Sequence, residues 1–397
     1  MMALSSPPPD LSDKSAFERE WPLLLECASP FADASRLAEM ARSVDWPRLL
    51  FLANEHGVAG HLAAISQKLG VDVVPAEVKK SLLDRQRAQV LSSLRMTAEL
   101  FRILEQFAAE EIHALVVKGP VLSVQAYGDP AMRSYGDLDL LVPQSDIRRA
   151  TELMIASGYE ARVSLNAIDA GKIPGQYLFS KSDSKLLVEL HNDRTLRYFP
   201  RPLPLEKFFA RQICVPLDGN EAPALSVEDE LILISIHGAK HFWERLIWIA
   251  DVASLITRQA SLGNLDWQRV LAAAEELGAL RMLFTGLRLA RDLLKARLPE
   301  AVQAEIYADA AAARLARSIS TWLPAAGDAP PGLFQRALFR IRMRGGLLSG
   351  AAYLVRLSLS PTEEDWEDDA KKKRLPFLDS LQRPFRLARK HGRYSKS

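Results

Sequence analysis

Cysteine and long apolar runs are scarce in this 397-residue sequence, and each absence excludes a class of protein. Cys27 and Cys214, the two cysteines, are far apart and in no metal-binding spacing, which argues against a disulfide framework and suits a reducing cytosol. No segment reaches roughly 18 uncharged apolar residues, the length that a membrane-spanning helix needs. The longest candidate, GGLLSGAAYLV, is bounded by Arg344 and Arg356. We therefore expect a cytoplasmic protein.

A strong charge of either sign is also missing. The formal net charge is +2, so the composition gives no general affinity for nucleic acid. Residues 1–14 are polar and proline-rich, and they contain neither the basic start nor the apolar segment of a secretion signal. We expect these residues to form a disordered leader.

What is present divides the sequence into regions with different periodicity. Apolar residues recur at helical spacing at first, change to short strand-like runs in the middle, and then return to helical spacing. The sequence therefore predicts an α+β fold, a small mixed sheet with helices that is flanked by helical N- and C-terminal regions. The expected regions are a leader at 1–14, a helical N-terminal region at 15–96, an α/β core at 97–225, a helical C-terminal region at 226–322, and a linker with a basic helical tail at 323–397.

The core pattern alternates short apolar runs with turn residues. It predicts strands in ALVVKG, DLDLLVP, YEARVS, QYLFSK and KLLVELHND, and helices over PVLSVQAYG and SDIRRATELMIASG. Ser145 is the expected N-cap of the second of these helices. Ser226, followed three residues later by Asp229, predicts the start of the first helix after the core.

Two like charges stand one residue apart in the predicted strand DLDLLVP. Because successive side chains of a strand point to opposite faces, Asp137 and Asp139 share one face, while Leu138 and Leu140 lie on the other. Two carboxylates this close repel each other unless a cation lies between them, and Mg²⁺ with oxygen ligands fits best. The alternative is a solvated strand end with two surface acids, but the apolar flanks favour a site at the mouth of a buried strand.

A third acid follows in the predicted strand KLLVELHND. Glu189 alternates with Val188 and Leu190, so a neighbouring strand could bring it to the same metal, the alternative being a surface acid on an edge strand. Three carboxylates can hold two Mg²⁺ ions about 4 Å apart, an arrangement that supports in-line phosphoryl or nucleotidyl transfer. His191 lies on the same face, and a hydrogen bond to Glu189 is favoured for it over proton transfer.

The tripeptide Lys118-Gly119-Pro120 precedes the first core helix. Gly permits a tight turn and close backbone approach, and Pro is favoured in the first turn of a helix. The turn therefore exposes a helix N-terminus, where free amides and the helix dipole attract phosphate and Lys118 adds a positive charge. Arg133, in the loop before the two aspartates, is a candidate to neutralise a further phosphate oxygen.

The order of strand, Gly turn, helix, Arg-containing loop and D-x-D strand resembles the nucleotidyltransferase superfamily typified by DNA polymerase beta. More closely, the sequence is similar to a group of bacterial nucleotidyltransferase family proteins. The resemblance covers about residues 40–300. The motifs that carry it are Lys118-Gly119, the stretch from Tyr127 to Val142, Gly158-Tyr159, Glu189-Leu190-His191 and HGAKHFWERLIWIADVASLI.

This resemblance implies a polymerase-beta-like core and a Mg²⁺-dependent enzyme. The enzyme would move a nucleoside monophosphate group from a nucleoside triphosphate (NTP) to an acceptor hydroxyl and release pyrophosphate. The resemblance further implies metal binding by Asp137, Asp139 and Glu189, and phosphate contact by Lys118 and Gly119. Two alternatives stay open, a catalytically inactive nucleotide-binding or scaffold protein of the same fold, and an enzyme whose acceptor is a protein or peptide.

One position of the turn departs from the wider superfamily. Most members have Gly-Ser or Gly-Gly there, and the Ser hydroxyl or the second Gly amide helps to hold the triphosphate. Pro120 provides neither group. Ser123, one turn into the helix, is the candidate to replace them.

A second group of polar residues lies beyond the core, in HGAKHFWERLIW. His237 and His241 are four residues apart and therefore project from one face of the predicted helix, at zinc-ligand spacing. Gly238 stands where a metalloprotease motif has Glu, and a zinc site would need a further ligand, for which Asp251 is the candidate. We favour histidines that pack near the active cleft with Lys240, where they meet a nucleotide or acceptor.

The C-terminal tail is strongly basic, since residues 371–397 hold ten Lys or Arg against one acid, Asp379. The simplest interpretation is a solvated helical extension with a frayed end. Contact with an anionic membrane surface comes next, because apolar residues such as Phe377 and Leu381 lie between the basic ones. No RNA-binding signature accompanies the charge, so we expect no sequence-specific binding of nucleic acid.

Overall fold

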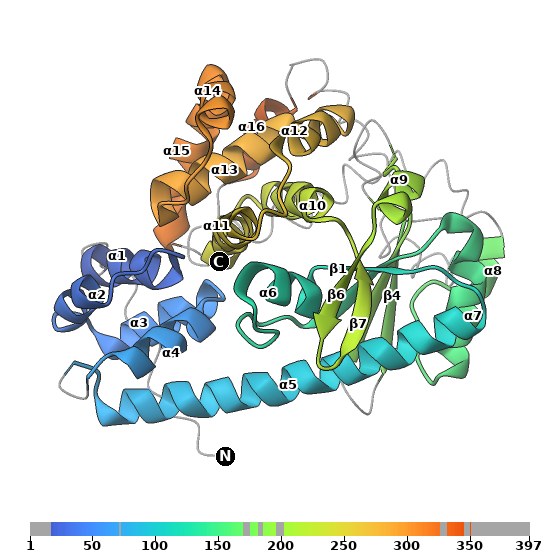
Figure 1. Ribbon diagram of the computed structural model, residues 1–397, viewed down its shortest axis with the longest axis horizontal. Coiled ribbons are helices and arrows are strands. Elements are labelled where there is room, and N and C mark those ends of the chain that lie inside the picture. Colours follow the sequence, from blue (N-terminus) through green and yellow to red (C-terminus); the bar gives the residue numbers. More distant parts are fainter. Residues whose placement is uncertain are drawn as a thin grey trace.

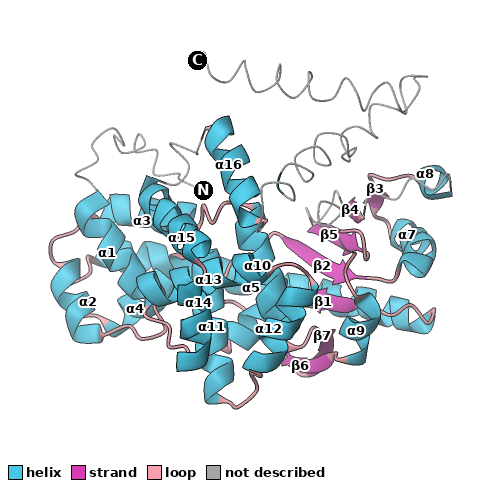
Figure 2. Ribbon diagram, turned by 90° about the horizontal axis from the view of Figure 1, so that it is seen from above, coloured by secondary structure: helices cyan, strands magenta, loops and turns pink. Residues whose placement is uncertain are grey.

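A helical body and a mixed β-sheet lie side by side in the computed structural model of the chain (Figures 1 and 2). The structure describes residues 17–70, 73–169, 175–181, 186–195, 202–325, 332–344 and 350. The expected leader at 1–14 and the basic segment at 371–397 lie outside these residues. The combination of helices with a mixed sheet confirms the predicted α+β class. Among the described helices, none is long and apolar enough to cross a bilayer.

The N-terminal helices form the part of the helical body that precedes the sheet. They are α1 (Phe17–Ala28), α2 (Ala34–Ala41), α3 (Trp46–Glu55), α4 (Ala59–Lys68) and α5 (Ala76–Ala109). Asp33 and Asp45 cap α2 and α3, because each carboxylate accepts a hydrogen bond from a free amide of the first turn. Pro75 immediately precedes α5, whose 34 residues run along the whole molecule (Figure 1). The expected boundary between 96 and 97 therefore lies inside one continuous helix.

The sheet has seven strands in the order β3-β4-β5-β2-β1-β7-β6. Their bounds are β1 (Leu115–Val117), β2 (Asp137–Leu141), β3 (Glu160–Ala161), β4 (Gln176–Lys181), β5 (Leu186–His191), β6 (Ile213–Leu217) and β7 (Asn220–Ala224). The central strand β2 is antiparallel to β1 and parallel to β5. The strand predicted in YEARVS is reduced to the two residues of β3.

The hairpin of β6 and β7 was not predicted as strands. Pro216 and Pro223 obscure it, because proline is rare in strands and is confined to edges and strand ends. Asp218 and Gly219, with φ of 49° and 85°, form the tight turn between the strands. The Asp-Gly pair is the hairpin signal that the sequence does contain.

The helices that connect the strands are α6 (Gly119–Tyr127), α7 (Ile147–Ala156), α8 (Leu165–Asp169) and α9 (Leu205–Ala210), with a 3-10 turn, η2 (Gln144–Asp146), before α7. The prediction that Ser145 caps α7 is wrong. Pro143 leads into the 3-10 turn, which contains Ser145, and Asp146 becomes the residue before the helix. No side chain caps α7.

The C-terminal helices form the rest of the helical body. They are α10 (Val227–Lys240), α11 (Leu246–Ser261), α12 (Trp267–Glu276), α13 (Leu280–Leu294), α14 (Glu300–Ala308), α15 (Ala310–Trp322) and α16 (Leu333–Met343), with η3 (Leu323–Ala325) after α15. The predicted start of α10 is confirmed, because the Ser226 hydroxyl accepts a hydrogen bond from the Asp229 amide at 3.2 Å. Trp243 is fully buried, and a Cβ at Gly238 or Gly286 would lie within 3 Å of its indole ring. Gly238 therefore makes room for this tryptophan.

Two apolar clusters cover the two faces of the sheet and decide where the acids of β2 point. Leu138 and Leu140 belong to the cluster on the side of α5 and α7. Leu141 belongs to the other cluster, which contains the buried residues of α10 and α11. Since side chains alternate along a strand, Asp137 and Asp139 share the face of Leu141. The acids of β2 are therefore directed toward the helical body.

Candidate active site

A cleft of about 470 Å³ lies between the sheet and the helices α10 and α11. Residues of β1, β2 and β5 line one side, including Asp137, Asp139 and Glu189. The Lys118–Gly119 turn lies in the same cleft. Six of the seven residues expected at the site from sequence therefore line one cavity, and the seventh, Ser123, does not.

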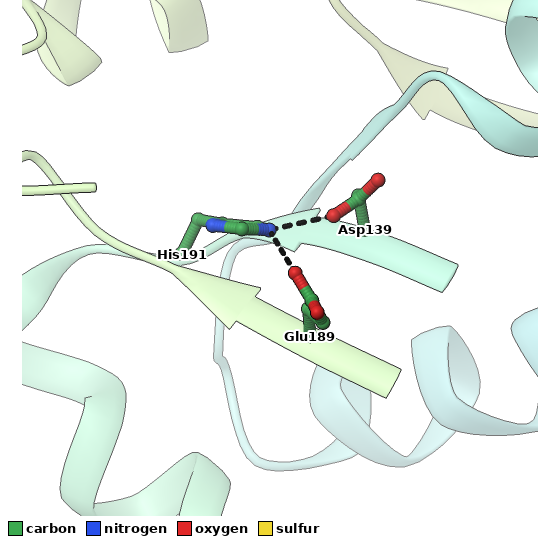
Figure 3. A group of neighbouring side chains, drawn as sticks. All are labelled: Asp139, Glu189 and His191. Atoms are coloured by element: carbon green, nitrogen blue, oxygen red, sulfur yellow. Dashed lines mark hydrogen bonds and ion pairs between the residues drawn. The ribbon is translucent and has the colours of Figure 1, made fainter. Parts of the chain in front are cut away.

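Register between β2 and β5 brings the acids together. The two strands are parallel, and Asp139 lies opposite Glu189 as a Cα pair, with Asp137 opposite Leu187. The imidazole of His191 points its Nε2 edge toward both carboxylates (Figure 3). Its Nε2 atom is 2.6 Å from Asp139 Oδ1 and 3.4 Å from Glu189 Oε2.

The ligand atoms of Asp139, Glu189 and His191 all lie within 4.8 Å of one another, which is close enough for one metal ion. His191 was expected to bond to Glu189, and its shortest contact in the structure is with Asp139 instead. Its other nitrogen, Nδ1, lies 2.6 Å from the Thr195 hydroxyl. A histidine held at both nitrogens has a fixed ring orientation. Sequence reasoning did not include His191 among the metal ligands.

Charges around Asp139 favour its ionised form. Burial alone would raise the pKa of this carboxyl, but Lys118 and the hydrogen bond with His191 outweigh it and hold the pKa well below its usual range. For His191, burial would lower the pKa, and the hydrogen bonds with Asp139 and Glu189 raise it overall. The Lys118 ammonium is 3.5 Å from Asp139 Oδ2. Asp139 is thus a buried carboxylate that is surrounded by cationic groups.

Asp137 lies on the same face, but Lys118 and His191 offset its environment only in part. Burial raises the pKa of its carboxyl, and the neighbouring Asp139 and Glu189 raise it further. Like charges therefore converge at the end of β2 that faces the cleft. A divalent cation would remove this repulsion, and carboxylate oxygens are its preferred ligands.

The Lys118–Gly119 turn begins directly after β1. Lys118 has φ 57° and ψ −138°, and Gly119 has φ 50°, so both residues adopt backbone conformations that L side chains avoid. At Gly119 the reason for glycine is this φ and not a lack of space, because the nearest atom to an added Cβ would be Asp137 O at 4.0 Å. Pro120 follows in the first turn of α6, where its missing amide costs no intrahelical bond.

The side chain of Glu230, on α10, stabilises this turn through a hydrogen bond. Glu230 was not identified from the sequence. Its Oε1 atom accepts a hydrogen bond from the Lys118 amide at 3.1 Å. Its Oε2 atom is buried without a hydrogen-bond partner among the described residues. Burial raises the pKa of this carboxyl to about 7 in spite of the nearby Lys118. The available signal was a third consecutive acid after Glu228 and Asp229, directly before the apolar run LILIS at 231–235.

Arg133 and Ser123 have other partners than the expected phosphates. The Arg133 guanidinium lies at the cleft but is mostly buried, and its Nη2 atom is 3.2 Å from Asp251 Oδ2. Tyr127 donates a hydrogen bond to the other oxygen of Asp251. The Ser123 hydroxyl is fully buried and donates to the Asp129 carbonyl at 2.6 Å. These contacts join α6, the loop before β2 and α11.

His237 and His241 line the opposite side of the cleft with Trp248. The two imidazole centroids are 4.7 Å apart, and each is 5.4 Å from the Trp248 ring. Asp251, the candidate third zinc ligand, is engaged by Arg133 and Tyr127. In the part of the chain that the structure describes, the ligand atoms gathered around a possible metal are those of Asp139, Glu189 and His191, and Asp137 is not among them.

The fold and the cleft, with carboxylates on adjacent strands beside a Gly turn, define a protein of the nucleotidyltransferase class. A family model described as an uncharacterised nucleotidyltransferase matches residues 42–295, which is more than half of the chain. The chain therefore belongs to this uncharacterised nucleotidyltransferase family, and the predicted resemblance to nucleotidyltransferase family proteins is confirmed.

Two further comparisons accompany this match. No curated protein matches the chain. A solved structure, an antigenic nucleotidyltransferase-like protein from Paracoccidioides brasiliensis, is similar to 52% of this chain and 94% of its own, with 17% sequence identity and a TM-score of 0.32.

Proposed function

We propose that the protein is a Mg²⁺-dependent nucleotidyltransferase with a polymerase-beta-like core, which moves a nucleoside monophosphate group from an NTP to an acceptor hydroxyl and releases pyrophosphate. The observation that carries this proposal is the pairing of Asp139 with Glu189 across two parallel strands, in the cleft that also contains the Lys118–Gly119 turn. Membership of a nucleotidyltransferase family supports it.

The acids fit a divalent cation. Asp137, Asp139 and Glu189 would hold it, since they line one side of the cleft and the repulsion of Asp137 by the other two is only partly offset by Lys118 and His191. Bound there, Mg²⁺ supplies positive charge that stabilises the oxygens of the transferring phosphoryl group, and three carboxylates suffice for two ions. His191 contacts Thr195 through Nδ1 and Asp139 through Nε2, and it thereby keeps the Asp139 carboxylate oriented.

The Lys118–Gly119 turn would receive the phosphates of the NTP. The turn begins α6, so its amides and the helix dipole favour negative charge, and the Lys118 ammonium is already positioned beside Asp139. In this role Lys118 meets the charge that collects on the leaving pyrophosphate. Arg133, paired with Asp251, holds the loop before β2 in place.

The chemical step is an in-line displacement at the α-phosphorus. Glu189 takes the proton of the acceptor hydroxyl, and the acceptor oxygen forms a bond to the α-phosphorus. The bond from that phosphorus to the oxygen bridging to the β-phosphate breaks, and pyrophosphate leaves with the electron pair. The proton on Glu189 then passes to solvent, which restores the carboxylate.

The proposal is tested by incubating the full chain with each NTP labelled at the α-phosphate, Mg²⁺ and cell extract. We expect a labelled acceptor and release of pyrophosphate, and we expect Asp139→Asn to reduce both by at least about 100-fold. Asp169→Asn is the matched control, because Asp169 pairs with Arg148 outside the cleft. Full activity of Asp139→Asn would refute the assignment, and NTP binding without pyrophosphate release would favour an inactive nucleotide-binding protein.

A further inference from the structure

A basic and aromatic surface faces the acids across the cleft. It consists of His237, Lys240, His241, Arg245 and Trp248, at the end of α10 and the start of α11, and all five residues line the cleft. We refer to it as the α10–α11 wall. The transfer step described above uses none of these residues.

The rings of the α10–α11 wall are ordered by packing against one another. The His237 imidazole meets the Trp248 ring at 86°, in an edge-to-face arrangement, and His241 lies tilted against both. Such contacts fix the ring orientations in the absence of hydrogen bonds. The wall is therefore preformed, and the two imidazoles are held where they border the cleft.

Positive charge converges on this wall. The side chains of Lys240 and Arg245 are exposed within the cleft lining. Burial is the main reason that the pKa of His241 falls to about 4, and Lys240, Lys118, Arg340 and Arg245 lower it further. The pKa of His237 is also well below its usual value, through burial and then Lys118. Both imidazoles are consequently neutral near pH 7, within a positive field.

A neutral imidazole offers one hydrogen-bond donor and one acceptor. Within the described residues, no hydrogen bond involves a ring nitrogen of His237 or His241. The wall thus combines two cationic side chains with imidazole donors that have no acceptor in the part of the chain that the structure describes. Guanidinium and ammonium groups together with N–H donors are the groups that proteins use to bind phosphate.

We propose that the α10–α11 wall is an oxyanion-binding subsite that holds a phosphate-type group of a substrate against Lys240 and Arg245. This inference deepens the proposed function and rests on it for the identity of the substrate. The phosphate belongs either to the distal end of the NTP or to a phosphorylated acceptor whose hydroxyl would then be directed toward the acids of β2 and β5.

The subsite is tested without metal, so that binding is measured apart from transfer. Inorganic phosphate is titrated into the full chain in EDTA by calorimetry. We expect binding to the wild type, and a loss of about tenfold or more in affinity for Lys240→Gln/Arg245→Gln, because two charge-assisted contacts are removed. Both side chains are exposed, so the fold should persist, and circular dichroism checks it.

The control removes the same charge elsewhere. Lys207→Gln/Arg314→Gln, on α9 and α15, changes two exposed residues that do not line the cleft and should bind phosphate as the wild type does. Absence of phosphate binding to the wild type, or equal affinity of wild type and wall variant, would overturn the subsite. Asp139→Asn should still bind phosphate, so a failure of the transfer reaction is distinguished from a failure of the subsite.

A second titration identifies the source of the phosphate. Phosphate is added in EDTA to protein saturated with ATP. Competition between the two ligands supports a subsite for the distal phosphates of the NTP. Simultaneous binding that is lost in Lys240→Gln/Arg245→Gln supports a subsite for a phosphorylated acceptor.

Discussion

Asp139 and Glu230 are both buried acids beside Lys118, yet their pKa values are shifted in opposite directions. Asp139 has the Lys118 ammonium and the His191 imidazole as partners, and its pKa lies well below its usual range. Among the described residues, Glu230 accepts a hydrogen bond only from the Lys118 amide, and burial raises its pKa to about 7. Burial alone therefore does not decide the charge of these acids. The cations that contact the carboxylate decide it.

The two acids also have different tasks in this account. Asp139 is ionised in the cleft and suits a cation, whereas Glu230 is a structural acceptor that holds the Lys118–Gly119 turn in its unusual conformation. Lys118 connects them, because its side chain contacts one acid and its backbone the other. Changes at these positions should therefore separate cleft chemistry from turn stability.

Among changes at these positions, Lys118→Met should give the largest loss of transfer activity. It removes the cation beside Asp139 and the positive charge offered to the leaving pyrophosphate, while the amide that bonds to Glu230 remains. We expect nucleotidyl transfer to fall by about 100-fold or more, as for other residues that stabilise charge in a transition state. Steady-state pyrophosphate release measures it, and Lys207→Met is the exposed control. Unchanged kcat/KM would show that Lys118 has no part in transfer.

Glu230→Gln should change the pH dependence of stability. The folded-state pKa of about 7 exceeds the unfolded value near 4.5, so the native state binds the extra proton between these pH values and stability falls as pH rises through them. The glutamine keeps an acceptor for the Lys118 amide without the charge. Denaturant unfolding measures the free energy of unfolding of both proteins at pH 5 and pH 8. The stability of the variant relative to the wild type should be higher at pH 8 than at pH 5, by up to about 3 kcal/mol.

This measurement is made as a difference between variant and wild type. His56 and His61 have pKa values of about 4, below the unfolded value of 6.5. Their contribution to protein stability therefore falls as the pH falls below 6.5, which is the opposite direction. Their contribution is shared by both proteins and cancels in the difference. An equal pH dependence for wild type and Glu230→Gln would mean that Glu230 is not held in a raised-pKa environment.

His191→Gln should have the smallest effect of the three. Glutamine can still bond to Asp139 but lacks the fixed ring between Asp139 and Thr195. We expect a loss of about tenfold in activity or metal affinity, which is usual for a group that orients a metal ligand. Transfer assayed over a range of Mg²⁺ concentrations measures it. A loss as large as that of Asp139→Asn would instead make His191 a direct participant.

Much of the carboxylate side of the cleft was predictable from sequence. The period of two along DLDLL places Asp137 and Asp139 on one face, and the same period identifies Glu189. The parallel register that pairs Asp139 with Glu189 is a tertiary feature and could only be expected as a possibility. The helix start at Ser226 was predictable because a side-chain cap is a local interaction.

Contacts between distant parts of the chain were beyond prediction. Glu230 bonds to a residue 112 positions away, and Asp251 meets Arg133 across α11 and the loop before β2. No local pattern specifies either partner. Conversely, Ser145 satisfied a local capping rule and failed because Pro143 starts a 3-10 turn, so that a competing local structure replaced the cap.

The central claim is that Asp139 and Glu189, from adjacent strands, hold one divalent cation. The most direct test is calorimetric titration of Mg²⁺ into the full chain and into Glu189→Gln, with Glu206→Gln on α9 as control. We predict binding to the wild type and the control, and a loss of at least about tenfold in affinity for Glu189→Gln. Mg²⁺ binding that is equal in Glu189→Gln and the wild type would contradict the account.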